Sequence, residues 1–169
     1  MQFPDTAVQT RFDTPLGPML AAATDVGLCG LWFDAQKHLP DITHWPSQPD
    51  HPVLRQTEDA MQAYFGGDMS DFQVPLDLRG GTAFQQAVWQ ALLRIPTGAT
   101  TTYGALSHSL GRPSAVRAVA GAVGRNPVSV IVPCHRVLGS DGSLTGYAGG
   151  LPRKTALLQR EATRQAVLL

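Results

Sequence analysis

Cysteine is scarce in this chain of 169 residues, which contains Cys29 and Cys134 and no further copies. Two cysteines so far apart cannot supply the dense disulfide framework that stabilises many small secreted proteins. We therefore expect both thiols to be free and the protein to work in a reducing compartment, with the cytoplasm as its location.

Long hydrophobic runs are missing as well. Residues 1–5 lack the basic start and following apolar run of a signal peptide. No apolar stretch approaches the roughly 20 residues of a membrane-spanning helix, so we expect no association with a membrane. With 43% hydrophobic residues the chain can build a core, and its length allows one domain or two small ones.

Acidic residues almost disappear after the midpoint of the chain. Residues 1–81 carry four basic and eleven acidic side chains, a net charge of −7. Residues 82–169 carry nine basic side chains against Asp141 and Glu161, a net charge of +7. Most of the basic residues are arginines, which bind phosphate well, so this asymmetry favours a nucleic-acid partner for the second half. A solvated basic face, or attraction between the two halves, would fit the same charges.

The first half of the chain has the pattern of a mixed α/β domain. Residues 53–64 predict a helix, which Gly66-Gly67 would end. Residues 72–78 alternate apolar and polar side chains and contain Pro75, as an edge strand would. Three further strands separated by turn residues predict a β-meander, and they cover residues 8–14, 19–24 and 27–33.

Gly80-Gly81 marks the expected boundary between an N-terminal α/β domain of residues 1–79 and a C-terminal domain of residues 82–169. In the second domain, residues 103–110 and 115–123 predict two short helices, and Gly111 allows a tight turn between them. This is the pattern of a helix-turn-helix, although an ordinary pair of antiparallel helices shares it. The positive charge of this half favours the DNA-binding alternative.

The tetrapeptide Pro133-Cys134-His135-Arg136 is the strongest candidate for chemistry. It follows Val128–Val132, an apolar run that predicts a buried extended segment ending at the proline. A reactive cysteine acts as the thiolate and needs an electropositive setting, which the next two residues could supply. An isolated Cys-His pair is more often a buried structural cysteine beside a histidine, so the surrounding motifs must decide.

Taken together, the motifs of the second half resemble those of the O6-alkylguanine-DNA alkyltransferase family. The resemblance covers residues 81–161 and is weak before them. It rests on Thr82-Ala83-Phe84-Gln85-Gln86-Ala87-Val88-Trp89, Ile95-Pro96-Thr97-Gly98, Thr102-Tyr103, Arg117-Ala118-Val119, Asn126-Pro127, Pro133-Cys134-His135-Arg136-Val137, Gly146-Tyr147-Ala148-Gly149-Gly150 and Lys154.

This resemblance implies an α+β protein without a cofactor. Its N-terminal part would be a small antiparallel sheet with a helix, ribonuclease H-like, and its C-terminal part a winged-helix-like helical domain with a helix-turn-helix. The implied activity is DNA repair by direct reversal. The alkyl group of O6-alkylguanine, and of O4-alkylthymine, would move from a base flipped out of duplex DNA to the protein's own cysteine, once per molecule. A monomer would suffice, because one flipped base needs one protein.

The resemblance also assigns catalytic roles. Cys134 would be the nucleophile, and His135 would take its proton through a bound water. Glu161 would orient the imidazole, and Tyr103 would donate to the departing guanine. Asn126 would join the helix-turn-helix to the cysteine segment through side-chain hydrogen bonds to backbone atoms. By residue type alone, Glu161 could be a surface residue near a helix end, and Tyr103 could pack on the core.

The resemblance also assigns residues that contact DNA and residues that line the pocket for the flipped base. By resemblance, Arg117 fills the gap that the flipped base leaves, and the small residues around it let the helix approach the DNA, unless they pack inside the domain. Arg136 would be structural or contact a phosphate. The remaining DNA contacts would be Thr102, Ala115, Ala118 and Arg125, and the residues lining the base pocket would be Val132, Ser140, Tyr147 and Lys154.

Metal binding and three other functions compete with this interpretation. Some family members hold zinc, but here Cys29 has only the irregularly spaced His38, His44 and His51 near it, so we expect no metal. A non-catalytic alkylated-DNA binding protein of the same fold would not need Cys134. A Cys-His thiol hydrolase needs an oxyanion hole, which no motif here supplies recognisably. A plain DNA-binding module leaves the Pro-Cys-His-Arg motif unexplained.

Overall fold

The computed structural model of the protein describes residues 1–167, with side chains up to residue 162. They form two compact units. The first contains Met1–Thr82 together with Pro127–Ser129, and the second contains Ala83–Asn126 and the residues from Val130 onward.

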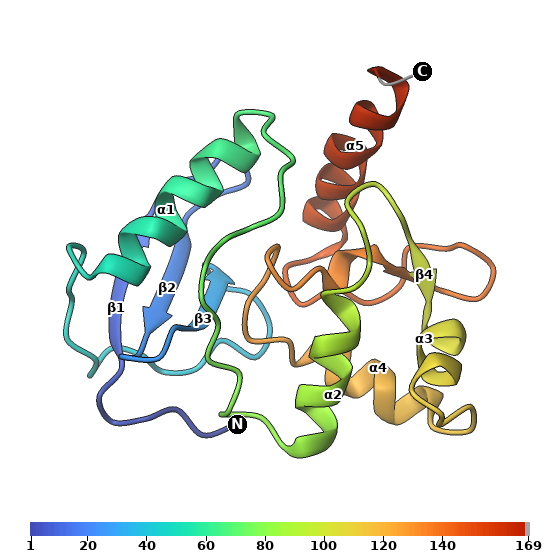
Figure 1. Cartoon of the computed structure of the whole chain (residues 1–169), viewed down its shortest axis with the longest axis horizontal. Helices are drawn as coiled ribbons and strands as arrows, with labels where there is room; N and C mark the ends of the chain where they lie inside the picture. The colour runs from blue at the N-terminus through green and yellow to red at the C-terminus, as the bar shows by residue number, and fades with distance from the viewer. Residues whose placement is uncertain (168–169) are drawn as a thin grey trace. The chain divides into compact units, whose positions relative to one another are not determined.

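The N-terminal unit is a three-stranded antiparallel sheet with one helix (Figure 1). Its strands are β1 (Val8–Phe12), β2 (Met19–Ala23) and β3 (Leu28–Phe33), in that order across the sheet. Helix α1 (Pro52–Phe65) contacts all three strands and buries one face, which carries Leu54, Thr57, Met61 and Tyr64. The predicted meander and the predicted helix are therefore confirmed.

An aromatic cluster fills part of the core of this unit. Phe3 meets the rings of Trp32 and Trp45 edge to face, with ring centroids 5.7 and 5.3 Å apart. Gly30 lies two residues before Trp32 on the same face of β3. A Cβ atom at Gly30 would lie 1.8 Å from the Trp32 ring, so the glycine allows the indole to cover the strand.

The C-terminal unit consists mainly of helices (Figure 1). They are α2 (Ala83–Leu92), α3 (Tyr103–Ser109), α4 (Val116–Gly124) and α5 (Leu151–Val167). The short strands β4 (Thr101–Thr102) and β5 (Val137–Leu138) pair in parallel, and the 3-10 helix η1 (Cys134–Arg136) precedes β5. Helices α3 and α4 contact each other, and Trp89 of α2 donates a hydrogen bond of 2.9 Å to the carbonyl of Ala122 in α4. The predicted α+β class is confirmed, with a small antiparallel sheet in the first unit and a helix-turn-helix in the second.

Two segments, one predicted as an edge strand and one as a buried extended segment, do not form strands. Of residues 72–78, only Leu76 forms a bridge, to Leu28. Residues 128–132 are buried, as expected, but they form a turn with one bridge, between Val128 and Leu31. Val130 has a φ of 71°, in the left-handed region, which a β-branched residue adopts only when its surroundings impose it. Packing has therefore overridden the β propensity of this run.

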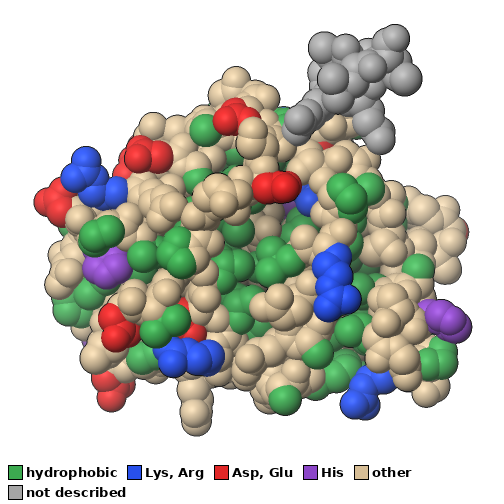
Figure 2. Space-filling model, viewed as in Figure 1, with side chains coloured by type: hydrophobic (Ala, Val, Ile, Leu, Met, Phe, Trp, Pro, Cys, Tyr) green, Lys and Arg blue, Asp and Glu red, His purple; other side chains and the backbone are tan. Residues whose placement is uncertain are grey.

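The surface carries charged side chains of both signs. On the face shown in Figure 2, they lie scattered among hydrophobic and neutral ones. None of the helices within residues 1–167 combines the length and hydrophobicity needed to cross a bilayer.

Candidate active site

Cys134 begins the 3-10 helix η1, and only 6% of its surface is exposed. Its Sγ accepts a hydrogen bond of 3.1 Å from Nδ2 of Asn126, and the same amide nitrogen donates to the carbonyl of Val132 at 2.7 Å. Asn126 comes directly after the C-cap residue of α4. One buried amide therefore ties the end of the helix-turn-helix to the cysteine.

The thiol of Cys134 is protonated at rest. Burial raises its pKa above the ordinary value of 9.0, while the hydrogen bond from Asn126 and the positive charge of Lys154 act in the opposite direction. Because burial is the largest effect, the resting group at neutral pH is the thiol. A base must take its proton when the sulfur reacts.

His135 is placed to be that base. It is fully buried, and its Nε2 lies 2.8 Å from Oε1 of Glu161. Burial lowers the pKa of His135 below 6.5, and Arg136 and Lys154 lower it further, although Glu161 acts to raise it. A neutral imidazole beside a carboxylate donates its proton to that carboxylate, which assigns the proton to Nε2. Within the described residues Nδ1 has no hydrogen-bond partner and can accept a proton.

Glu161, on α5, is held by several donors. Arg136 contacts both of its oxygens, with Nε 2.8 Å from Oε2 and Nη2 2.9 Å from Oε1, and the backbone N–H of Gly98 lies 3.5 Å from Oε2. Burial opposes ionisation of this carboxyl group, but the hydrogen bonds from His135 and Arg136 outweigh it and hold the pKa at about 2. Glu161 is therefore a buried carboxylate, and the surface alternative does not apply.

Arg136 is buried and donates hydrogen bonds within the protein, which favours the structural one of the two alternatives that the sequence left open. It is 5% exposed, and its Nη1 and Nη2 donate to the Ile95 carbonyl at 2.6 Å and to Oγ1 of Thr97 at 3.2 Å. These bonds explain the Ile95-Pro96-Thr97-Gly98 motif, because this turn supplies partners to both Arg136 and Glu161.

Lys154 and Tyr103 meet at the loop between β5 and α5. Lys154 is fully buried, and its Nζ donates to the carbonyls of Val137 at 2.6 Å and Thr145 at 2.8 Å. The Tyr103 hydroxyl lies 3.4 Å from the carbonyls of Thr145 and Gly146. Burial raises the pKa of Tyr103, so its hydroxyl keeps its proton and remains a donor.

The other residues predicted to line the base pocket lie in different settings. Tyr147 is half-buried, and Ser140 is exposed on the loop after β5. Val132 is buried, and its carbonyl already accepts hydrogen bonds from Asn126 and from the backbone N–H of Cys134. Reading of the base by Val132 and Ser140 stays a prediction.

The predicted DNA-contacting residues gather on α3 and α4. Thr102 caps α3, because its Oγ1 accepts a hydrogen bond of 3.1 Å from the N–H of Ala105. Ala115 is half-buried at the start of α4, while Arg117 and Ala118 are exposed on it. Arg125, at the end of α4, is exposed and donates to the Gly121 carbonyl at 3.2 Å.

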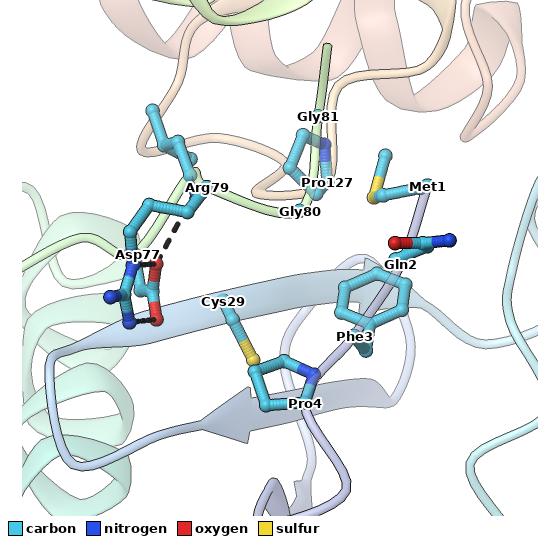
Figure 3. Close-up of a pocket in the computed structure, with 11 residues that line it drawn as sticks. Met1, Gln2, Phe3, Pro4, Cys29, Asp77, Arg79, Gly80, Gly81 and Pro127 are labelled. Atoms are coloured by element: carbon cyan, nitrogen blue, oxygen red, sulfur yellow. Dashed lines mark hydrogen bonds and ion pairs between the residues drawn. The ribbon is translucent and has the colours of Figure 1, made fainter.

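The second cysteine lies in a pocket of about 380 Å³ in the N-terminal unit (Figure 3). Arg79 bridges both oxygens of Asp77 at 2.8 Å, and Thr24 donates to the same carboxylate at 2.7 Å. Burial and the negative charge of Asp77 raise the pKa of Cys29 to about 12, which makes it a poor nucleophile. No group of three metal-ligating side chains occurs within the described part of the chain.

Comparison with known proteins agrees with this geometry. The DNA-binding domain of 6-O-methylguanine DNA methyltransferase matches residues 83–163, and the ribonuclease-like domain of the same family matches residues 8–78. A methylated-DNA–protein-cysteine methyltransferase of Mycobacterium bovis is 48% identical over 152 residues, which cover 90% of each chain. The chain belongs to the 6-O-methylguanine DNA methyltransferase family.

Other members of the methyltransferase family extend the likeness. A methylated-DNA–protein-cysteine methyltransferase of Haemophilus influenzae is 43% identical over 90% of this chain and 84% of its own. The crystal structure of Mycobacterium tuberculosis OGT in complex with DNA superposes with a TM-score of 0.86 at 45% identity, covering 93% of this chain and 94% of that one. The predicted ribonuclease-like N-terminal fold and the family resemblance are both confirmed.

Two features of the site escaped the sequence reasoning. One is the contact between Asn126 and the sulfur, since only a backbone role was expected for this amide. The other is the enclosure of Glu161 by Arg136 and the 95–98 turn. A usable signal for the second was present, because Glu161 is one of only two acidic residues among nine basic ones in residues 82–169.

Proposed function

We propose that this protein repairs alkylated DNA by moving the alkyl group from O6 of guanine to Sγ of Cys134, once per molecule. The observation that carries the proposal is the buried arrangement of a thiol, a neutral histidine with a free Nδ1 and a carboxylate on its Nε2. Family membership supports the reaction class, because relatives are methylated-DNA–protein-cysteine methyltransferases.

The proposed reaction is a displacement at the alkyl carbon. The S–C bond forms as the bond between that carbon and O6 breaks, and the electron pair of the broken bond stays with guanine. The thiol proton passes through a water to Nδ1 of His135, and Glu161 stabilises the resulting imidazolium. The Tyr103 hydroxyl keeps its proton and donates a hydrogen bond to the departing guanine anion. No later step removes the alkyl group from the thioether, so the protein is consumed.

Access to O6 requires the nucleotide to leave the base stack, which costs a few kcal/mol. We propose that α4 lies against the minor groove and that Arg117 enters the gap. Exposure of Arg117 and Ala118 supports this assignment, since a small side chain lets the helix approach closely. O4-alkylthymine is proposed as a second substrate.

The remaining assignments are also proposals. Duplex DNA carrying the damaged base is the proposed partner, and the DNA complex of the Mycobacterium tuberculosis relative supports it. We propose a monomer and a domain boundary at Gly80-Gly81. We propose a cytoplasmic location, which is supported by two free cysteines.

Intact mass spectrometry with peptide mapping tests the proposal on a duplex that contains one O6-methylguanine. We expect a gain of one CH2 per chain, located on Cys134 and stopping at one equivalent. Cys134→Ala should keep its mass but still bind the duplex, and Cys29→Ala should gain CH2 like the wild type. Tight binding by the wild type without a change in mass would instead support a non-catalytic binder of damaged DNA.

A further inference from the structure

Three charged or titratable side chains form one buried, hydrogen-bonded cluster in the C-terminal unit. His135, Arg136 and Glu161 are 0%, 5% and 1% exposed. The guanidinium and the carboxylate cancel each other, so the cluster is neutral as long as the imidazole is neutral. Burial makes an unbalanced charge costly, and this neutrality therefore depends on Arg136.

Arg136 and Glu161 form a buried ion pair in which His135 also takes part. Oε1 of Glu161 is shared, since it lies 2.8 Å from Nε2 of His135 and 2.9 Å from Nη2 of Arg136. The guanidinium is itself fixed from behind by the Ile95 carbonyl and Oγ1 of Thr97. Its planar set of donors therefore holds the carboxylate in the orientation that His135 requires.

We propose that Arg136 is a positioning residue for alkyl transfer, which shares Glu161 with His135 and so keeps the imidazole neutral and able to accept the thiol proton. This inference rests on the proposed function. It gives Arg136 a purpose beyond holding the fold, because the charge state of the base depends on it.

The charge of Arg136 disfavours the imidazolium form of His135, and the other charged groups nearby do not reverse this effect. Lys154, on α5, also disfavours the imidazolium, whereas Glu161 favours it. The thiol of Cys134 is neutral at rest. Without the charge of Arg136, the buried His135–Glu161 pair would carry one negative charge and would take up a proton at higher pH. The two groups titrate as one unit, so the extra proton blocks the base whichever residue holds it.

The rate of alkyl transfer measured against pH tests the proposal. In Arg136→Gln, we expect the acidic limb of the profile to move up by about one to two pH units, the usual effect of a close charge. Arg136→Lys keeps the charge and should leave the limb near its wild-type position even if the rate falls. Thr97→Val removes a partner of Arg136 without changing charge, and it should also leave the limb in place. An Arg136→Gln profile that is lower but not displaced would overturn the proposal and leave a structural role only.

A second measurement uses the wild-type protein and does not depend on the folding of a variant. Imidazole ¹⁵N chemical shifts should show His135 neutral at pH 7, with the proton on Nε2. An imidazolium at pH 7 would overturn the inference, because the resting base would then already carry the extra proton. Wild-type protein that fails to transfer alkyl groups would sink the proposed function, and the ¹⁵N spectrum would still decide the charge state of His135.

Discussion

Among single residues, Asn126 connects the helix-turn-helix, which is proposed to bind DNA, with the reactive Cys134. Its amide donates to both the Val132 carbonyl and the sulfur of Cys134, and its side chain is buried. Asn126→Ala removes a donor that favours the thiolate, so we expect slower alkylation by free O6-methylguanine base, by about tenfold for a loss near 1.4 kcal/mol. With the free base as substrate, the measured rate does not depend on how well the variant binds DNA.

The same substitution should lower the free energy of unfolding by about 1–3 kcal/mol, because a buried hydrogen bond is lost. Urea unfolding measures this change. Unaltered alkylation kinetics in a destabilised Asn126→Ala protein would show that the amide holds the fold but does not activate the thiol.

At the scale of elements, α4 carries the proposed DNA-binding surface. Arg117 is exposed on it, and we propose that its side chain replaces the flipped base. Arg117→Ala should therefore slow repair of duplex DNA more than it slows reaction with the free base. Single-turnover rates at saturating protein separate this effect from weaker binding.

Arg125→Ala is the matched control for α4, because it removes an exposed arginine at the end of the same helix. We expect it to weaken binding through a lost phosphate contact and to leave the saturated rate near wild type. Equal losses on duplex and free base in Arg117→Ala would refute a role in base flipping.

At the scale of the whole molecule, the buried site makes stability depend on pH. The pKa of His135 is lowered in the folded protein, so below about pH 6.5 the unfolded chain binds a proton there that the folded chain excludes. The free energy of unfolding should therefore fall as the pH drops from 7 to 5. Glu161 adds a further loss only between pH 4.5 and about 2, where its folded and unfolded protonation differ.

Urea unfolding at a series of pH values measures this dependence. His135→Gln removes the titrating group and keeps a donor for Glu161, so its stability should depend less on pH between 7 and 5. A slope identical to that of the wild type would mean that other groups cause the loss.

The features that depend on near neighbours could be predicted from the order of the residues alone. The helix predicted over residues 103–110 is α3, which the Thr102 hydroxyl caps, while the meander and the helix-turn-helix follow from turn residues and local periodicity. The motif around Cys134 was also readable, and its resemblance to known motifs indicated the family.

Contacts between groups far apart in the chain could not be predicted in this way, because they depend on the fold. Arg136 and Glu161 are 25 residues apart, and Arg136 and Ile95 are 41 apart, so no local pattern could pair them. The β-branched run before Cys134 became a buried turn with Val130 in the left-handed region, against its propensity. The physical reason is the same in both cases. The free energy of burying charges and side chains depends on which groups surround them, and that is set by the fold as a whole.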